Sequence, residues 1–308
     1  MPAARTVLMS RKVKLLSIFV KPCRCVVCDF LAIAINNKRG DTMSNHNILL
    51  IHGTWCNGGN WGNFATELKD RGFTVYTPSL RHHGAPSEDT WMNAQKVAKV
   101  GLLDYVEDIL ELVDAMDSPP IIVGHSLGGL IAQLVAERRL NKGLILLGTA
   151  PTAGMFNLYT TSILVWLRYL PQWLMRKPMY PCSWDLWKKR ICNSQSEEIQ
   201  KLYYGTLCAE SGTTYFEMAL WYLDRKRSAR VNFDAITSPV LVVSGLEDKC
   251  VAPRIARVTA QRYSYLSTLE EISGSDHMMI FGGYMHETLA RIDLWLKKHN
   301  LAPVTSTK

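Results

Sequence analysis

The sequence has no apolar run long enough to cross a membrane. Of the two apolar stretches near its start, residues 15–20 end at Lys21 and Pro22, and residues 26–35 are interrupted by Asp29. A membrane-spanning helix needs about 20 predominantly apolar residues, and a secretory signal peptide needs one unbroken apolar core. The sequence also has no internal repeat and no low-complexity tract. These absences argue against an integral membrane protein and against a repeat architecture.

Acidic residues are scarce only in the first 40 positions. The formal net charge is +8, but residues 1–40 hold eight of the 35 Lys and Arg residues and one of the 27 Asp and Glu residues. The rest of the chain is therefore close to neutral, at +1. A folded domain that binds nucleic acid usually carries a basic patch of its own. We therefore expect no nucleic-acid partner.

A cysteine spacing typical of a disulfide framework is absent too. The eight cysteines are scattered over positions 23, 25, 28, 56, 182, 192, 208 and 250. Cys23, Cys25 and Cys28 are irregularly spaced and have no obvious fourth ligand nearby, so a metal site is the weaker interpretation of them. A chain of 308 residues can bury a large core without disulfides. We expect reduced thiols, no metal, no organic cofactor and a cytoplasmic protein, while the oligomeric state stays open.

Residues 1–42 differ in composition from the rest of the chain. They hold most of the excess positive charge, and they end just before Met43 and the first clear strand. Three interpretations are open: a weak amphipathic membrane anchor, a cleaved targeting segment, or an extension that is not part of the working protein. We favour the extension, with weak contact to a membrane surface as the alternative.

From residue 47 onward, short apolar runs alternate with helical patterns. Strands are predicted at residues 47–51, 73–77, 121–123, 143–147, 240–243 and 269–272, and helices at 61–70, 96–116, 130–137, from 253 and at 284–298. Residues 85–95 have the composition of a polar loop. Continuous apolar strands that alternate with helices predict an α/β fold with a mostly parallel sheet of about six strands, covered by helices on both faces.

The alternation stops between residues 150 and 231. This segment shows no clear strand and holds five of the nine tryptophans. Pro171, Pro178 and Pro181 divide it, and prolines in helix interiors break helices. The segment is therefore predicted to be an inserted helical cap of short helices. Most of its aromatic side chains are expected to form the core of the cap, and some to line a pocket.

Gly124-His125-Ser126-Leu127-Gly128 stands between a predicted strand and a predicted helix. The pattern Gly-x-Ser-x-Gly in this context is typical of a nucleophile elbow, in which the serine hydroxyl points out of the sheet. The glycines are needed because side chains at Gly124 and Gly128 would collide across so tight a turn. The helix that follows aims its N-terminal N–H groups at the place where an oxyanion would form. Ser126 is the predicted nucleophile.

A serine nucleophile needs a base, and the base needs a group that orients it. Asp248 and His277 each follow a predicted strand, and their order after Ser126 is the one that the elbow predicts. Asp248 is the predicted acid and His277 the predicted base. Glu247 is the second choice for the acid. Asp276 is a weaker rival, because a neighbour in the sequence is expected to point away from the imidazole.

Other histidines and cysteines near the predicted site have simpler explanations. His125 is expected to pack under the elbow, His52 to hold the loop after the first strand by hydrogen bonds, and His286 to lie in the last helix. Cys56 and Cys250 are expected to be bystander thiols, because neither occupies an elbow.

On these motifs the chain resembles the alpha/beta hydrolase superfamily, in particular members with a lid. The resemblance runs from about residue 47 to residue 299, without the two further strands that commonly precede the first one here. It is similar to the compact branch that includes plant methyl esterases and hydroxynitrile lyases, and bacterial esterases with lids fit as well. The resemblance implies that His52, Gly53 and Thr54 mark an oxyanion loop. The oxyanion donors are then the backbone N–H groups of Leu127 and of Thr54 or Trp55.

The resemblance extends to the loop at residues 78–84, which in the superfamily often reads Asp-hydrophobe-Arg-Gly-His-Gly. Ser79 and His82 replace two of those residues, a departure that we expect to change the shape of the loop rather than the chemistry. The expected domains are an N-terminal extension (1–42), a hydrolase core in two parts (43–149 and 232–300), the helical cap or lid (150–231) and a polar tail (301–308).

Residues and resemblance together predict a serine hydrolase that cleaves carboxylic esters through an acyl-enzyme. An aromatic-rich cap favours a small substrate with an apolar acyl chain or an aromatic group, and lipid esters and thioesters are compatible with it. Two alternatives stay open. One is a C–C hydrolase or hydroxynitrile-lyase-like enzyme with the same triad, and the other is a ligand-binding relative without turnover.

Overall fold

The structure is a computed structural model that describes residues 46–155 and 160–303. All described residues belong to one compact unit. The predicted extension over residues 1–42, with its three cysteines, lies outside the described residues, as do residues 304–308 of the predicted tail. Among the described helices, none has the length and apolar character that a membrane span requires.

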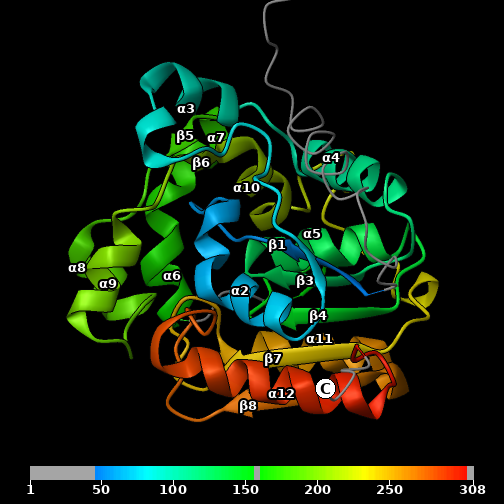
Figure 1. The fold of residues 1–308 in the computed structure, drawn as a ribbon. Coiled ribbons are helices and arrows are strands. Elements are labelled where there is room, and N and C mark those ends of the chain that lie inside the picture. The colour runs from blue at the N-terminus through cyan, green and yellow to red at the C-terminus, as the bar shows by residue number, and fades with distance from the viewer. Residues whose placement is uncertain (1–45, 156–159, 304–308) are drawn as a thin grey trace, which may run out of the picture. The chain divides into compact units, whose positions relative to one another are not determined.

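A six-stranded sheet forms the centre of the fold (Figure 1), and every neighbouring pair of its strands is parallel. In spatial order the strands are β2 (Thr74–Tyr76), β1 (Asn47–Ile51), β3 (Ile121–His125), β4 (Gly143–Leu147), β7 (Val240–Gly245) and β8 (Ser267–Ile272). This confirms the predicted fold class, with each strand within a few residues of its expected bounds.

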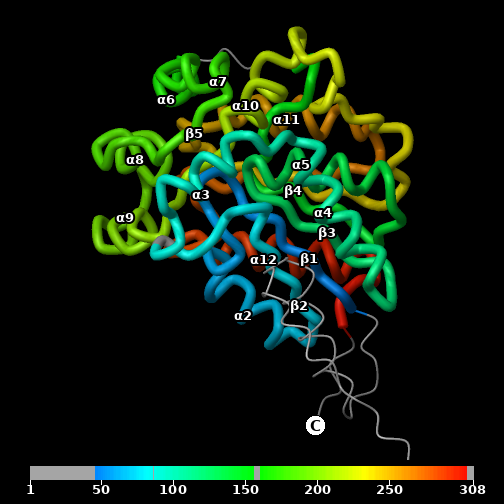
Figure 2. The backbone as a smooth tube through the Cα atoms, turned by 90° about the horizontal axis from the view of Figure 1, so that it is seen from above, coloured from blue at the N-terminus to red at the C-terminus, as the bar shows by residue number. Residues whose placement is uncertain are grey.

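Both faces of the sheet are buried along its four central strands, because alternate residues of β1, β3, β4 and β7 enter two separate hydrophobic clusters. Ile48 and Leu50 of β1 join the cluster of α2 and α12, whereas Leu49 and Ile51 join that of α4, α5 and α11. Figure 2 shows α2 and α5 on opposite sides of β1 and β3. The flanking helices are α2 (Gly62–Asp70), α4 (Leu102–Asp114), α5 (Leu127–Ala136), α11 (Pro253–Tyr263) and α12 (Met285–Lys298). Burial on both faces explains why these strands are unbroken apolar runs.

The prediction of one helix over residues 96–116 after a polar loop over residues 85–95 is wrong. The structure has two helices there, α3 (Trp91–Val97) and α4, after a short 3₁₀ turn at Pro86–Glu88. Thr90 starts α3 early, because its hydroxyl accepts a hydrogen bond from the backbone N–H three residues later. Gly101 separates the helices in an extended conformation, and its N–H donates to Asp104 Oδ2 at 2.7 Å.

The regular secondary structure described between β4 and β7 (residues 150–231, called the insertion below) is mostly helical. Its helices are α6 (Thr160–Trp166), α7 (Leu170–Met175), α8 (Trp184–Arg190), α9 (Glu197–Tyr204) and α10 (Gly212–Ala219), with a 3₁₀ turn at Leu167–Tyr169. The expectation that it holds no strand is wrong, because β5 (Pro178–Met179) pairs with β6 (Glu210–Ser211) in antiparallel fashion. Strands of two residues are too short to show any alternation in the sequence.

A buried polar cluster joins β6 of the insertion to the core. Glu210 is fully buried, and its Oε1 accepts a hydrogen bond from the Tyr105 hydroxyl of α4 at 3.0 Å. Its Oε2 lies 3.2 Å from His83 Nε2, in the loop after β2. Burial alone would lower the pKa of His83, but the Glu210 carboxylate outweighs it and raises the pKa above the usual value. Long-range contacts of this kind hold the short β5–β6 pair in place.

Candidate active site

Ser126 follows β3 in a backbone conformation that few residues other than glycine adopt. Its φ is 55° and its ψ is −121°, and α5 begins at the next residue, Leu127. Such a conformation costs about 1–3 kcal/mol and persists only where the surroundings enforce it. A Cβ at Gly124 would lie 2.2 Å from the carbonyl oxygen of Gly128, and a Cβ at Gly128 would lie 2.2 Å from that of Ile51. Glycine is therefore required on both sides of this sharp turn.

The turn at Ser126 lies where the order of the strands in the sheet reverses. β1 pairs with β2 on one side and with β3 on the other, and the remaining strands continue outward from β3. In open α/β sheets a switch point of this kind leaves a crevice outside the carboxyl ends of the strands. The loop after β1 and the turn after β3 therefore meet at one place.

Asp248 and His277 come together after the neighbouring strands β7 and β8. His277 Nδ1 lies 2.7 Å from Asp248 Oδ2, and both side chains are almost fully buried. Asp248 Oδ1 accepts hydrogen bonds from the backbone N–H groups of Cys250 and Val251, each at 2.8 Å. Because an ionised carboxylate only accepts hydrogen bonds, Nδ1 of His277 carries the hydrogen and Nε2 is left with a free lone pair. The hydrogen bond to Asp248 thus favours the tautomer of His277 in which Nδ1 is protonated.

Two effects compete in the pKa of His277. Burial alone would lower the pKa, but the Asp248 carboxylate, together with a hydrogen bond to the Cys250 thiol, holds it well above its usual value. Burial raises the pKa of the Cys250 thiol itself, so this thiol is uncharged near neutral pH. The charge that stabilises a protonated His277 therefore comes from Asp248.

The other residues considered as acid or base either lie at the surface or bind other groups. Glu247 and His286 are exposed at the surface. His52 is buried and joins two loops: its Nε2 accepts a hydrogen bond from the Leu80 N–H at 3.0 Å, and its Nδ1 lies 2.9 Å from the Gly53 carbonyl oxygen. These contacts are of the loop-holding kind expected for His52.

Asp276 binds the insertion rather than the imidazole. Its Oδ2 accepts a hydrogen bond from the backbone N–H of Ser194 at 2.7 Å, and its Oδ1 from that of Met278 at 2.9 Å. Burial raises the pKa of Asp276 to about 6. Its carboxylate therefore joins the loop that carries His277 to the segment between α8 and α9, a connection that sequence reasoning missed.

The insertion also holds the loop after β1, where two of the predicted oxyanion donors lie. Trp55 has a left-handed φ of 63°, and its indole N–H donates to the Met179 carbonyl oxygen at 3.0 Å. Its own carbonyl oxygen accepts a hydrogen bond from the Cys208 N–H at 2.7 Å. Thr54 Oγ1 lies 2.6 Å from the Tyr215 hydroxyl oxygen. The shape of this loop therefore depends on contacts with residues more than 120 positions away.

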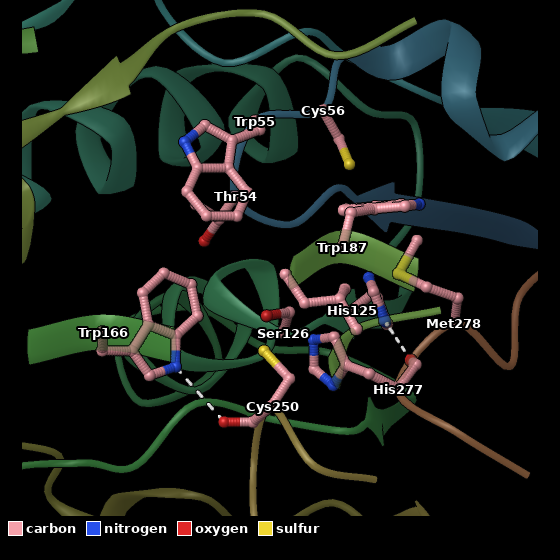
Figure 3. Close-up of a pocket in the computed structure, with 11 residues that line it drawn as sticks. Thr54, Trp55, Cys56, His125, Ser126, Trp166, Trp187, Cys250, His277 and Met278 are labelled. Carbon is pink, nitrogen blue, oxygen red and sulfur yellow. Dashed lines mark hydrogen bonds between the residues drawn. The ribbon is translucent and has the colours of Figure 1, made fainter. Parts of the chain in front are cut away.

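One pocket brings Ser126, His277 and the loop after β1 together (Figure 3). It is lined by Thr54, Trp55, Cys56, His125, Ser126, Trp166, Trp187, Ile191, Cys250, His277 and Met278. Its cavity volume is about 20 Å³, which is room for about one water molecule. Trp166, Trp187 and Ile191 belong to the insertion, so the insertion closes the pocket in this conformation.

The pocket lining contains two thiols, those of Cys56 and Cys250. Burial raises the pKa of Cys56 to about 12, and it also raises that of Cys250. Both thiols are therefore protonated near neutral pH and are weak nucleophiles. Cys250 lines the same pocket as His277. Within residues 46–155 and 160–303, no group of three or more His, Cys, Asp or Glu side chains is placed to hold a metal ion.

The two departures from the superfamily pattern, Ser79 and His82, lie in the loop after β2. His82 has a left-handed φ of 64°, at the position where the superfamily often has glycine. Its carbonyl oxygen accepts a hydrogen bond from Asn93 Nδ2 at 2.8 Å, and its side chain is exposed. Ser79 Oγ accepts a hydrogen bond from the Gly58 N–H at 3.1 Å and thereby fixes the end of the loop after β1.

Replacing His82 with glycine should stabilise the fold by about 1 kcal/mol, because an L-residue pays a steric cost in the left-handed region that glycine avoids. A change of this size should raise Tm by roughly 2–4 °C in a domain of this size class. His82→Ala is the matched control, since it removes the same exposed imidazole but keeps the Cβ. Thermal unfolding in which the glycine variant melts no higher than the alanine variant would contradict this account.

Comparisons with known proteins agree with this architecture. A profile of the alpha/beta hydrolase family matches residues 48–291. The chain is also 30% identical over 93 residues to a carbendazim hydrolyzing esterase from Nocardioides sp. (strain SG-4G). That alignment covers 30% of this chain and 36% of the esterase, so it spans only about a third of the relative's length.

Two solved structures share the fold, each with a TM-score of 0.60. An extracellular alpha/beta-hydrolase from a Paenibacillus species is 22% identical, with 82% of this chain and 98% of that chain covered. A monoacylglycerol lipase from Paleococcus ferrophilus is 20% identical, with 82% and 94% covered. At such identities the likeness concerns the fold alone. Because the family profile covers most of the sequence and the sheet has the matching topology, the chain belongs to the alpha/beta hydrolase family.

Proposed function

We propose that this hydrolase cleaves carboxylic esters through an acyl-enzyme formed on Ser126. The observation that carries most weight is the Asp248–His277 pair, with 2.7 Å between Oδ2 and Nδ1, whose imidazole lines the same pocket as Ser126. A serine on a strained strand-to-helix turn, an imidazole and a buried carboxylate are the three groups that acyl transfer by this mechanism uses. The name of the esterase that is 30% identical over 93 residues supports the same substrate class.

Each group has a defined task in the proposed reaction. His277 Nε2 takes the proton of Ser126 Oγ while Oγ bonds to the acyl carbon, and Asp248 stabilises the imidazolium that forms. The tetrahedral oxyanion accepts hydrogen bonds from the N–H groups of Leu127 and of Thr54 or Trp55. His277 then gives its proton to the departing alcohol oxygen, and the C–O bond breaks. Water repeats the sequence on the acyl-enzyme and releases the acid.

The pocket walls favour a substrate with an apolar or aromatic group near the reacting carbonyl. Trp55 stacks on Trp166 with 5.4 Å between ring centroids, and Trp187 closes another side of the pocket. A cavity with room for about one water molecule cannot hold an ester. The insertion therefore acts as a lid, which moves away from Ser126 when substrate enters.

The test of this function is formation of the acyl-enzyme. With p-nitrophenyl esters of increasing acyl-chain length, stopped-flow absorbance should show a burst of p-nitrophenol whose amplitude equals the concentration of active sites. Labelling by a fluorophosphonate should place the mass increase on the peptide that contains Ser126. Failure of both would favour a ligand-binding relative without turnover. Labelling without ester turnover would favour C–C or hydroxynitrile cleavage by the same triad.

A further inference from the structure

His125 has one ring nitrogen that is buried without a partner. Its Nε2 lies 2.9 Å from the carbonyl oxygen of His277. A carbonyl oxygen only accepts hydrogen bonds, so Nε2 carries the hydrogen and Nδ1 is an acceptor. Burial lowers the pKa of His125 to about 3, which keeps the ring neutral and preserves this tautomer. Nδ1 is buried and has no hydrogen-bond partner among the described residues.

The unpartnered nitrogen belongs to a residue that lines the pocket of Ser126. In Figure 3 the ring edge with the free nitrogen is opposite the hydrogen bond to His277 and is turned toward Trp187. A Cβ at Gly53 would lie 3.1 Å from this Nδ1 and 2.9 Å from the Cβ of Ser126. The backbone of Gly53 therefore packs directly against His125 and Ser126, and a side chain there would force one of them to shift.

No described residue donates a hydrogen bond to this acceptor. The pocket lining also contains Trp187, Met278 and Cys56. The indole N–H of Trp187 is likewise buried and has no hydrogen-bond partner among the described residues. The Cys56 sulfur already faces the Tyr203 hydroxyl at 3.9 Å. A buried acceptor in such surroundings is costly unless a water or a ligand donates to it. The cavity is of the size that a water molecule, or one hydroxyl or amino group, would fill.

We propose that His125 Nδ1 determines specificity by accepting a hydrogen bond from a small donor group on the carbon next to the scissile carbonyl. The favoured substrates are then esters of 2-hydroxy or 2-amino acids rather than of unsubstituted acids. His125 precedes Ser126 in the chain, so a substrate group that binds His125 must lie close to the nucleophile. A donor group on the carbon next to the scissile carbonyl meets this condition. This inference rests on the proposed ester hydrolysis.

The matched substrates are p-nitrophenyl glycolate and p-nitrophenyl propionate, which differ by a hydroxyl in place of a methyl group of similar size. p-Nitrophenyl fluoroacetate is the control for electron withdrawal, because fluorine draws electrons but donates no hydrogen bond. Each kcat/KM is divided by the rate constant for alkaline hydrolysis of the same ester. We expect the corrected value for glycolate to exceed those for the other two esters by about 10- to 100-fold, as when a buried acceptor loses its donor.

Two variants distinguish the roles of the two ring nitrogens of His125. In His125→Asn the side-chain oxygen can replace Nδ1, and in His125→Gln the side-chain N–H can replace Nε2 and still donate to the His277 carbonyl. The preference for glycolate should survive in His125→Asn and fall to about unity in His125→Gln. Either variant is read only as a ratio between substrates, so a general loss of activity does not disturb the comparison.

The outcomes are distinguishable. Equal corrected kcat/KM values for glycolate and propionate in the unmodified enzyme overturn the inference but leave ester hydrolysis intact. A preference that persists in His125→Gln also overturns it, because the donor must then be bound elsewhere. If neither these three esters nor any ester of the acyl-chain-length series is hydrolysed, the proposed function itself fails, and the inference that rests on it fails with it. If neither variant folds, equal corrected values for the three esters in the unmodified enzyme still overturn the inference.

Discussion

Ser126→Ala is expected to lower kcat toward p-nitrophenyl esters by about 10⁶-fold, the size of loss seen when the nucleophile of a serine triad is removed. Without Oγ no acyl-enzyme can form, and the burst of p-nitrophenol should disappear. Alanine keeps the Cβ that lies against Gly53 and leaves the backbone at the turn unchanged. Thermal unfolding should therefore stay close to that of the parent protein.

The matched control is Ser244→Ala. Ser244 is buried near the carboxyl end of β7, and its hydroxyl lies 3.5 Å from the Gly245 carbonyl oxygen. It thus resembles Ser126 in burial and in its place at a strand end, but it has no part in the proposed chemistry. Its variant should retain kcat within a small factor. Fluorophosphonate labelling of another serine, or a burst that persists in Ser126→Ala, would contradict the assignment.

The four central strands could be predicted from the sequence because they are buried on both faces. Gly143–Leu147 has no exposed residue, so it stands out as an unbroken apolar run and was predicted to the residue. The helix over residues 96–116 was predicted wrongly because apolar spacing continues across the break. What ends the first helix and starts the second is local: Gly101 is extended, and Asp104 binds its N–H. The spacing of apolar residues along the sequence does not reveal such a cap.

In the candidate site, the residues that could be predicted were those with a local pattern. The turn at Ser126 is flanked by glycines, and the loops of Asp248 and His277 each follow an apolar strand, so a nearby sequence pattern predicts each of them. No nearby sequence pattern predicts which residues of the insertion bind these loops. Asp276 binds Ser194 across 82 positions, and Thr54 binds Tyr215 across 161. These pairs exist only because the insertion packs on the core.

The insertion contacts all the loops that carry the proposed chemistry. It binds the loop after β1 through Trp55 and Thr54, and the loop of His277 through Asp276. Asn193 Nδ2 also donates to the carbonyl oxygen of Glu247, next to Asp248, at 3.1 Å. A movement of the insertion that admits substrate would therefore act on both the oxyanion donors and the base. Closure of the pocket and alignment of the catalytic groups are expected to occur together.

The acid can be identified by isosteric substitution. Asp248→Asn should lower kcat by about 10⁴-fold, because an amide N–H facing Nδ1 would favour the wrong tautomer of His277. The amide oxygen can still accept from the N–H groups of Cys250 and Val251, so the loop should keep its shape. Glu247→Gln is the control, since this neighbouring side chain is exposed and should tolerate the change without loss of kcat.

The pH profile separates this role of Asp248 from a structural one. The neutral imidazole is the base, so kcat/KM of the parent enzyme should rise as pH increases through the pKa of His277, which Asp248 holds above the ordinary value against the opposing effect of burial. In Asp248→Asn the charge is gone and burial prevails, so the pKa should fall below the ordinary value and the acidic limb should move to lower pH. A variant that loses activity without this shift would show that Asp248 acts only on the loop. A larger loss in Asp276→Asn than in Asp248→Asn would identify Asp276 as the acid.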